Sequence, residues 1–256
     1  MNTLSFFGLN FNAVPLSVAA EQIVNAADAG QKGLVVTPNV DHVVMLDTDI
    51  EMRHIFQKAM FCYPDGMPLV WLSRLLKGVS FPERVTGADL LPAVCKVAAE
   101  RDKRVFFLGG QQGVAEKAAQ NMGDQFSGLQ VAGTYCPPMG FEHNQSEQIK
   151  ILELINNAKV DILFLGVGTP KQEKWAWNNI QLLHVGPILC VGAALDFAAG
   201  ITKRAPDLMQ RAGLEWLWRL CREPRRLWKR YLLRDSRFIG IAFRELFISF
   251  SKNRSE

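Results

Sequence analysis

The chain has 256 residues, of which 48% are hydrophobic and 21% charged, and it carries a formal net charge of +4 at pH 7. These values are typical of a soluble globular protein built as one large α/β domain, or as one domain with an appendage. We expect no signal peptide, because residues 1–5 lack a basic start that leads into an apolar stretch. We also expect no membrane span, because no segment offers some 18 uncharged apolar residues.

The cysteines and histidines predict neither a disulfide framework nor a metal site. The cysteines are odd in number and never spaced as Cys-x-x-Cys, which is typical of reduced, cytosolic thiols. The histidines lie far apart without the paired spacing of metal ligands. These residues are Cys62, Cys95, Cys136, Cys190 and Cys221, and His42, His54, His143 and His184.

The charge is distributed unevenly along the chain. From Gly200 onward there are 14 Lys and Arg against 6 Asp and Glu, a balance of +8, whereas the preceding residues carry a balance of −4. A mildly acidic body followed by a basic tail indicates that the tail meets something anionic, such as phosphate, a membrane surface or nucleic acid.

The first elements in chain order alternate between strand and helix patterns. Residues 4–12 predict a short strand pair, and residues 17–29 a helix with Ser17 as its N-cap and Gly30 as its stop. Residues 33–37 read as a strand, and residues 41–60 as mostly helical.

The motif Asp47-Thr-Asp49 requires a separate test, because many glycosyltransferases hold a metal–nucleotide complex with Asp-x-Asp. Such a motif follows the end of a strand, whereas this one lies within or between helical segments. Asp and Thr also start helices routinely. The helix-associated interpretation is therefore favoured over a metal site.

The turn Pro64-Asp-Gly-Met-Pro68 follows a short apolar run and precedes a predicted helix over residues 69–76. Asp65 in so constrained a turn has two interpretations of equal weight. It is either an Asx-turn residue that shapes the backbone, or a carboxylate held at the sheet edge as a general base.

Two later loops offer candidate anion contacts. Arg84 lies on a loop before a helix that runs to residue 101, and from there a guanidinium can reach a phosphate or carboxylate. The strand at residues 104–108 is followed by a glycine-rich loop at 109–113 and a helix to residue 122, an arrangement that can cradle phosphate. The loop lacks both Gly-x-Gly-x-x-Gly and a Walker lysine, so this signal is weak.

Residues 161–175 contain the strongest structural signal in the chain. After a strand pattern at residues 129–133 and a helix at 145–157, an unbroken apolar run ends in Gly166-Val-Gly168 and leads into Thr169-Pro170. A run that is apolar on both faces predicts a central parallel strand. The carboxyl end of such a strand is where open α/β sheets bind ligands, so Lys171, Gln172 and Glu173 are expected to direct polar groups into a crevice.

The alternation of strands and helices predicts an α/β fold, a Rossmann-like parallel sheet with helices on both faces, over residues 1–206. It continues through a helix at 173–183 and a strand at 188–192. We expect residues 207–256 to form a basic helical C-terminal appendage rich in Trp and Arg. Its arginines Arg219, Arg222 and Arg226 recur at helical spacing, although Pro224 begins a new helix. Such a tail suits an anionic membrane interface, and the alternative is a solvated basic helix packed on the core.

Five motifs together resemble the WecG/TagA/CpsF glycosyltransferases. They are Thr37-Pro-Asn39, Pro64-Asp-Gly-Met-Pro68, Arg84-Val-Thr-Gly-Ala-Asp89, Gly166-Val-Gly-Thr-Pro-Lys-Gln-Glu173 and Gly192-x-x-x-Asp196. The agreement runs in order along nearly the whole chain, without a departure at the diagnostic positions.

The resemblance implies inverting, metal-independent transfer of a sugar from a UDP-sugar to a polyprenyl-diphosphate-linked sugar, with no cofactor. It places the enzyme at the cytoplasmic face of the bacterial membrane, in the synthesis of surface polysaccharide or teichoic-acid linkage units. The sugar itself, whether N-acetylmannosamine, its uronic acid or another hexose, and the oligomeric state stay open, so a homo-oligomer is not excluded.

The resemblance also assigns roles to residues. Asp65 is the general base, Thr37 and Asn39 line the acceptor or sugar pocket, and Gly168, Pro170 and Gln172 hold the nucleotide-sugar. The leaving diphosphate requires positive charge, for which Arg84 and the tail arginines Arg219, Arg222 and Arg226 are the candidates.

Two other classes of protein compete with this interpretation. A nucleic-acid-binding protein would use the basic, aromatic tail, but the charge is confined to one end and no known binding motif accompanies it. A dinucleotide-dependent oxidoreductase would share the sheet pattern, but the Gly-x-Gly-x-x-Gly fingerprint is missing. We therefore expect no nucleic-acid partner.

Overall fold

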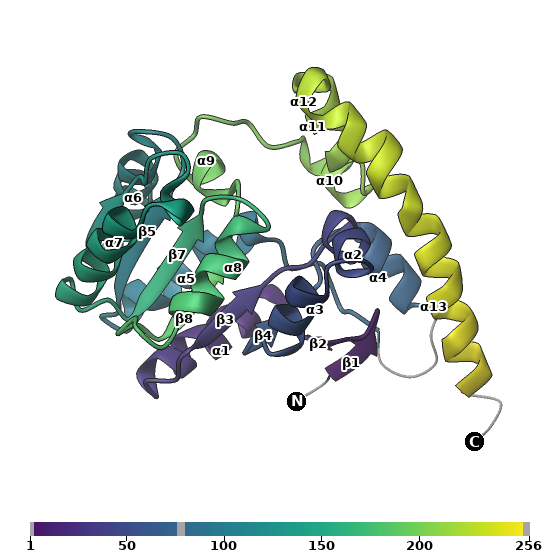
Figure 1. Ribbon diagram of the computed structural model, residues 1–256, viewed down its shortest axis with the longest axis horizontal. Helices are drawn as coiled ribbons and strands as arrows, with labels where there is room; N and C mark the ends of the chain where they lie inside the picture. The colour runs from purple at the N-terminus through teal and green to yellow at the C-terminus, as the bar shows by residue number, and fades with distance from the viewer. Residues whose placement is uncertain (1–2, 76–79, 253–256) are drawn as a thin grey trace.

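A parallel sheet forms the centre of the protein (Figure 1). The computed structural model describes residues 3–75 and 80–252, and within them the sheet has six strands in the order β4-β3-β8-β7-β5-β6. All neighbouring strands run parallel. This confirms the Rossmann-like α/β prediction. The strands are β3 (Gly33–Val36), β4 (Phe61–Cys62), β5 (Arg104–Gly109), β6 (Gln130–Tyr135), β7 (Ile162–Gly166) and β8 (Pro187–Cys190).

Strand β7 lies inside the sheet, between β5 and β8. Its side chains alternate between two hydrophobic clusters, with Leu163 and Leu165 on one face and Ile162 and Phe164 on the other. All four are fully buried. The apolar run at residues 161–166 is therefore a central strand covered on both sides, as predicted.

Helices cover both faces of the sheet. The cluster that contains Ile162 and Phe164 is completed by α1 (Leu16–Asp28), α5 (Gly87–Glu100), α6 (Val114–Gln125) and α9 (Ala194–Ala198). The cluster that contains Leu163 and Leu165 is completed by α2 (Val40–Leu46), α3 (Ile50–Gln57), α7 (Gln145–Asn157) and α8 (Lys171–Asn179), with the short η1 (Phe141–His143) before α7.

The N-terminal strand pair is a hairpin separate from the main sheet. Strands β1 (Thr3–Phe6) and β2 (Leu9–Asn12) pair antiparallel, as the sequence predicts. Phe6, Leu9 and Phe11 are buried, and Phe11 packs edge-on against Phe81 at 5.2 Å between ring centroids. The hairpin thus extends the core beyond the edge of the sheet.

Several predicted helix boundaries differ from the structure: the helix predicted over residues 69–76 is α4 (Met67–Ser73), with residue 76 outside the described part of the chain, and the helix predicted over residues 173–183 is α8. Two further differences concern capping residues. Helix α1 begins at Leu16 with Pro15 as its N-cap residue, so Ser17 lies inside the helix and caps nothing. The predicted helix over residues 41–60 is two helices, because Asp49 starts a new one. Its carboxylate accepts a hydrogen bond of 3.0 Å from the backbone N–H of Met52 at the start of α3.

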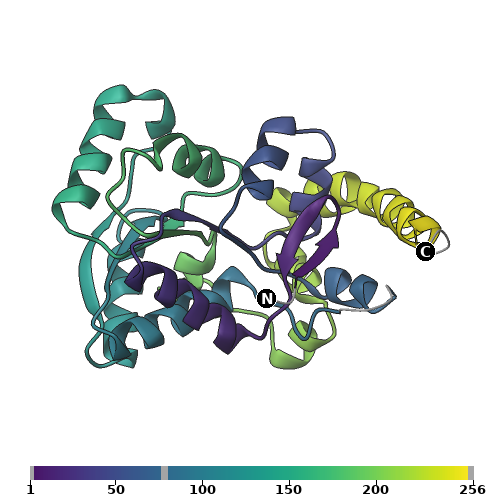
Figure 2. The same ribbon diagram turned by 90° about the horizontal axis from the view of Figure 1, so that it is seen from below.

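The C-terminal region is a chain of short helices that ends in a longer one. It comprises α10 (Asp207–Arg211), α11 (Glu215–Arg222), α12 (Pro224–Trp228), the π-helical η2 (Lys229–Arg234), the 3₁₀-helical η3 (Asp235–Arg237) and α13 (Phe238–Lys252). Pro224 is the first residue of α12, as predicted. In Figures 1 and 2 this region crosses from α9 to the side of the molecule that carries α2 and β1. Its assignment as a separate unit, residues 207–256, stays a prediction.

The C-terminal helices are held to the body by charge and by packing. Asp41 at the start of α2 is buried and pairs with Arg230, at 2.8 Å, and with Arg234. The Phe238 ring packs on Phe7, with centroids 5.7 Å apart. Part of the positive charge of the tail therefore meets carboxylates of the acidic body.

Across residues 3–75 and 80–252, every helix falls short of the length and apolarity needed to cross a lipid bilayer.

Candidate functional site

A cleft of about 710 Å³ opens at the carboxyl ends of β3, β4, β7 and β8, and the C-terminal helices form its opposite wall. This is the edge at which open parallel sheets bind ligands. The body contributes Thr37, Asn39, Asp41, His42, Asp65, Arg84, Gly168, Thr169, Pro170, Gln172 and Gly192, and the C-terminal helices contribute Glu215, Trp216, Arg219, Arg230, Arg234, Asp235 and Ile239. The sheet edge and the appendage thus share one site.

Asp65 stands in a turn that backbone hydrogen bonds hold in place. Its N–H donates to the carbonyl of Pro38 at 3.0 Å, and the carbonyl of Pro64 accepts from the N–H of Val85 at 2.7 Å. Gly66 follows with φ of 109°, a conformation that side chains disfavour. The turn therefore fixes the carboxylate beside the Pro38–Asn39 loop.

The environment of Asp65 favours its neutral form. The pKa of Asp65 is raised to about 6, chiefly by burial and also by the nearby Glu215 carboxylate, while His42 and Arg84 act in the opposite direction. A carboxylate with a raised pKa is a better proton acceptor than an ordinary aspartate. Of the two interpretations left open by the sequence, this environment favours the general base.

A pH profile tests this reading. We expect kcat/KM to rise with pH through about 6, because only the ionised Asp65 can accept a proton. Glu215→Gln removes a negative charge that raises this pKa, so its acidic limb should move to lower pH. Glu153→Gln, on the exposed surface of α7, serves as the control. An unchanged limb in Glu215→Gln would contradict the assignment.

Arg84 lines the cleft, but its guanidinium is engaged by the C-terminal helices. One nitrogen donates to Glu215 at 2.9 Å and another to the side-chain oxygen of Gln210 at 2.7 Å. Arg204 lies 3.8 Å from the same Glu215 carboxylate and pairs with Asp89. Arg84 therefore joins the body to the appendage at the cleft wall.

The loop after β7 brings together three residues that the sequence singled out. Gly168 adopts φ of 88°, and the Thr169–Pro170 peptide bond is cis. Gln172 is buried, and its side-chain oxygen accepts from the N–H of Gly192 at 3.1 Å. Gln172 thus ties the loop after β7 to the loop after β8. Lys171, in contrast, pairs with Glu142 at 3.0 Å.

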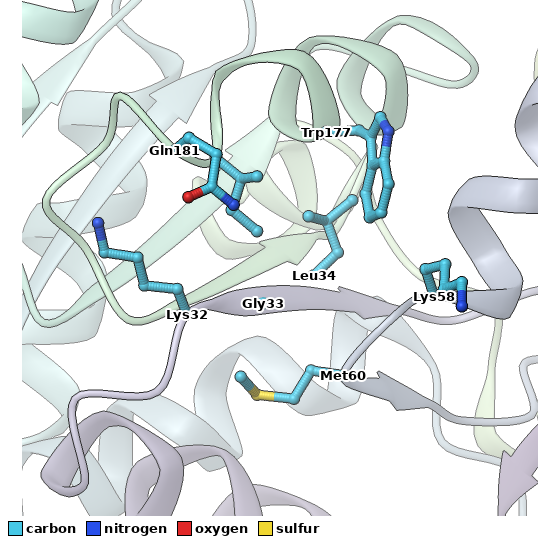
Figure 3. Close-up of a pocket in the computed structure, with 8 residues that line it drawn as sticks. Lys32, Gly33, Leu34, Lys58, Met60, Trp177 and Gln181 are labelled. Carbon is cyan, nitrogen blue, oxygen red and sulfur yellow. The ribbon is translucent and has the colours of Figure 1, made fainter.

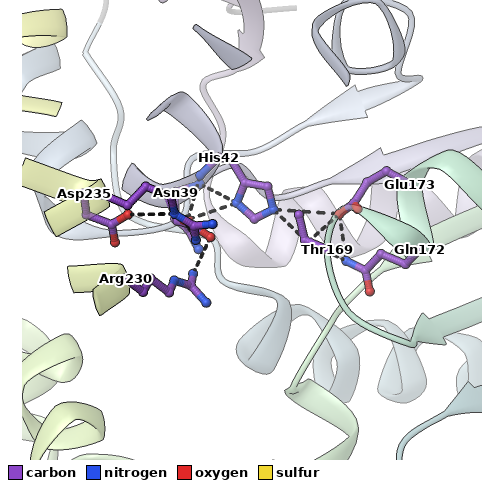
Figure 4. A network of polar contacts seen from close by, with 9 residues as sticks. Asn39, His42, Thr169, Gln172, Glu173, Arg230 and Asp235 are labelled. Carbon is purple, nitrogen blue, oxygen red and sulfur yellow. Dashed lines mark hydrogen bonds and ion pairs between the residues drawn. The ribbon is translucent and has the colours of Figure 1, made fainter. Parts of the chain in front are cut away.

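A polar network at the wall of the cleft connects this loop to α2 (Figure 4). The Thr169 hydroxyl donates to Glu173 at 2.9 Å, and the Gln172 amide donates to the same carboxylate oxygen at 2.8 Å. The ring of His42 lies between Thr169 and Asn39. The contact between His42 and Thr169 had no signal in the sequence, because the two residues are 127 positions apart.

The tail arginines named from the sequence occupy different places. Arg219 lines the cleft, and its Nε is buried without a hydrogen-bond partner among the described residues. Arg222 lies outside the cleft, with its guanidinium 5.7 Å from the centroid of the Trp218 ring. The side chain of Arg226 lies outside the described part of the chain.

Sequence reasoning missed Arg230 and Arg234, which also line the cleft. The sequence pattern could have indicated them, because both continue the four-residue spacing that Arg222 and Arg226 begin. The Nε of Arg230 is another buried donor without a partner among the described residues. Unpaired guanidinium donors in a cleft are suited to anionic oxygens.

The carboxylates of Asp47-Thr-Asp49 serve the fold. Asp49 caps α3 and pairs with Lys174 at 3.1 Å, while Asp47 pairs with Arg244 and lies 3.9 Å from Arg237. The helix-associated interpretation is confirmed. In the part of the chain that the structure describes, no group of three or more His, Cys, Asp or Glu side chains is arranged to hold a metal ion.

A second hollow, of about 500 Å³, lies at the amino end of β3 (Figure 3). It is lined by Lys32, Gly33, Leu34, Lys58, Met60, Trp177, Ile180 and Gln181. None of the residues singled out as functional belongs to it. The chemistry therefore concentrates at the other end of the strand.

The fold and the main cleft define a class of protein. A Rossmann-like sheet presents a carboxylate of raised pKa to a cleft that arginine side chains also line, as a group-transfer enzyme with an anionic leaving group requires. Residues 4–252 match the model of the "Glycosyl transferase WecG/TagA/CpsF family", and the chain belongs to this family. It is therefore a glycosyltransferase, which decides against the nucleic-acid-binding and oxidoreductase alternatives.

Two curated relatives are similar to this chain over most of the length of both proteins. The chain is 29% identical over 205 residues to the N-acetylglucosaminyldiphosphoundecaprenol N-acetyl-beta-D-mannosaminyltransferase of Bacillus spizizenii, covering 80% of this chain and 77% of the relative. The enzyme of the same name from Bacillus subtilis is 29% identical over 197 residues, covering 77% and 73%.

Proposed function

We propose that the protein transfers a sugar of the N-acetylmannosamine class from a UDP-sugar to a polyprenyl-diphosphate-linked N-acetylglucosamine, with inversion and without a metal. The names of the two Bacillus relatives support the sugar and the acceptor. The observation that carries the proposal is the Asp65 carboxylate, held in a rigid turn with a pKa of about 6 on a cleft that guanidinium groups also line.

The reaction is a single displacement at the anomeric carbon. Asp65 accepts the proton of the acceptor hydroxyl as the oxygen of that hydroxyl bonds to the anomeric carbon, and the bond from that carbon to the UDP oxygen breaks. Attack from the face opposite the leaving group inverts the anomeric configuration. Thr37 and Asn39, which flank Pro38 beside the Asp65 turn, are placed to orient the acceptor or the donor sugar.

Negative charge develops on the UDP oxygen as it leaves, and arginines supply the compensating charge. Arg219 and Arg230 are the best placed, because each lines the cleft with a buried Nε that no described residue pairs. Gly168, Pro170 and Gln172 form the loop that cradles the nucleotide. Arg222 and Arg226 stay predictions as further contacts.

The acceptor requires the enzyme to work at a lipid surface, the cytoplasmic face of the membrane. Ile239, Phe243 and Phe247 repeat every fourth residue along α13 and are 62%, 70% and 74% exposed, while Phe238, Ile241 and Ala242 turn into the core. We define the first three as the α13 stripe. An apolar stripe flanked by basic residues is suited to an anionic membrane interface.

The purified protein tests the proposal directly. We expect it to release UDP and extend a short-chain prenyl-diphosphate-linked N-acetylglucosamine when given UDP-N-acetylmannosamine. The rate should exceed that with its uronic acid form or with UDP-glucose, and it should survive EDTA. Product NMR reports the anomeric configuration. Loss of activity in EDTA with recovery on adding Mn²⁺ or Mg²⁺ would contradict metal independence, and inactivity with every UDP-sugar would contradict the donor class.

A further inference from the structure

We infer that His42 is a positioning residue that fixes the side-chain amide of Asn39, so that the Asn39 NH₂ group faces the cleft as a hydrogen-bond donor to a substrate oxygen. The inference rests on the proposed function for its substrate and on the polar network in Figure 4 for its geometry. His42 itself is largely buried, with a side chain 12% exposed.

The oxygen of the Asn39 amide is committed to His42. Asn39 Oδ1 lies 2.9 Å from the ring Nδ1 of His42 and accepts from the His42 backbone N–H at 3.3 Å. Nδ1 also lies 3.3 Å from the backbone nitrogen of Asn39, and a proton on Nδ1 directs the ring to Oδ1, the shorter of these two contacts. No described residue accepts a hydrogen bond from Asn39 Nδ2, so the NH₂ group is what this side chain offers to the cleft that it lines.

The other ring nitrogen of His42 is anchored in the buried interior. Its Nε2 lies 3.1 Å from the Thr169 hydroxyl and 3.8 Å from Glu173 Oε1. Glu173 is 1% exposed, and its second oxygen has no hydrogen-bond partner among the described residues. With Nδ1 as the donor the neutral ring accepts at Nε2, and the Thr169 hydroxyl, which lies 3.1 Å from Nε2 and 2.9 Å from Glu173 Oε1, joins the ring to the buried carboxylate.

The ring is therefore a rigid spacer between a buried anion and a ligand-facing amide. It makes the position of Asn39 depend on the loop after β7, which also carries Gly168 and Gln172. Since Asp65 is bonded through its N–H to Pro38, the Asn39 amide and the base stand on neighbouring backbone. A substrate oxygen held by Asn39 is thus oriented relative to the proton acceptor.

The test is a double-mutant cycle in the full-length enzyme. His42→Ala is expected to lower kcat/KM by about 10- to 100-fold, the scale for a misplaced orienting group. If His42 acts through Asn39, adding His42→Ala to Asn39→Ala should change kcat/KM less than about threefold. Effects that multiply in the double variant, or near-normal activity of His42→Ala, would overturn the inference.

Two conservative variants separate positioning from a merely structural role. His42→Asn places an amide near the former Nδ1 and should retain most activity, whereas His42→Gln reaches the Nε2 position and should behave as His42→Ala. Equal loss in both, with equally lowered melting temperatures, would point to a structural role alone. His54→Asn, at an exposed histidine of α3, is the control.

The inference and the proposed function fail differently. If the wild-type enzyme shows no turnover with any UDP-sugar, the proposed function fails, and a crystal structure of His42→Ala still decides the inference. The Asn39 amide should then have rotated away from its position in the parent protein. An unmoved amide would overturn the positioning role, whatever the substrate.

Discussion

Asp65→Asn is expected to lower turnover by roughly 10²-fold or more while leaving the fold and UDP binding intact. The substitution keeps the size and shape of the side chain but removes its ability to accept a proton. The backbone bonds that hold the turn, from Asp65 to Pro38 and from Val85 to Pro64, do not involve the carboxylate. The loss should therefore appear in kcat.

The raised pKa of Asp65 makes this variant informative about stability as well. Burial and Glu215 disfavour the ionised carboxylate in the folded protein, so the neutral amide should not destabilise the fold at neutral pH. We expect an unchanged or higher melting temperature together with the loss of turnover. This combination distinguishes removal of a base from general damage to the site.

The matched control is Asp124→Asn at an exposed position of α6. Thermal shift with UDP would show that the nucleotide still binds Asp65→Asn, since a ligand that binds only the folded state raises its melting temperature. Turnover of Asp65→Asn within a few-fold of the wild-type value would remove Asp65 from the role of base. The acceptor proton would then have to reach another group on the cleft.

Local patterns predicted the central part of the fold. The apolar run at 161–166 could be predicted as a buried strand. Helices cover both of its faces, so its sequence shows no alternation of polar and apolar residues. The turn at Asp65 was legible because proline and glycine restrict the backbone in known ways. Pro224 marked the start of α12 for the same reason. In each case the local structure is determined by residues that lie close together in the sequence.

Contacts between segments that are far apart in the chain could not be predicted from the sequence. Arg84 was expected to reach a phosphate or a carboxylate, but the sequence did not indicate Glu215, 131 positions away, as the carboxylate that its guanidinium binds. Asp41 showed no sign of being the buried partner of Arg230 and Arg234. Periodicity reports which face of a helix is apolar, but it does not report which carboxylate of another segment a basic residue will meet.

Removing residues from Asp207 onward is expected to have the other large effect: release of the protein from anionic liposomes and a depressed turnover of a water-soluble acceptor analogue. The deletion takes away the α13 stripe, and it takes away Arg219 and Arg230 from the cleft wall. Each basic residue near an anionic leaflet contributes about 1 kcal/mol to binding. Liposome sedimentation and UDP release measure the two losses separately.

The deletion also uncovers groups that the appendage now covers. Asp41 would lose both of its arginine partners, and the ring of Phe7 would lose that of Phe238. A buried charge without its partner is costly, so circular dichroism and the melting temperature must accompany the activity measurement. A folded truncation that turns over the soluble analogue normally would leave the appendage as an anchor only.

Point variants in the full-length chain test the membrane-binding role and the catalytic role of the C-terminal helices separately, without this loss of packing. Replacing Phe243 and Phe247 of the stripe, which lie outside the cleft, together by serine removes exposed apolar groups, so liposome binding should fall while turnover of the soluble analogue persists.

Arg219→Gln should do the reverse: it should retain liposome binding and lower turnover by removing charge from the cleft. Arg225→Gln, exposed on α12, is its control. If the stripe variant binds anionic liposomes as tightly as the parent, α13 is not the anchor. If Arg219→Gln turns over the soluble analogue as fast as Arg225→Gln, the arginine does not stabilise the leaving group.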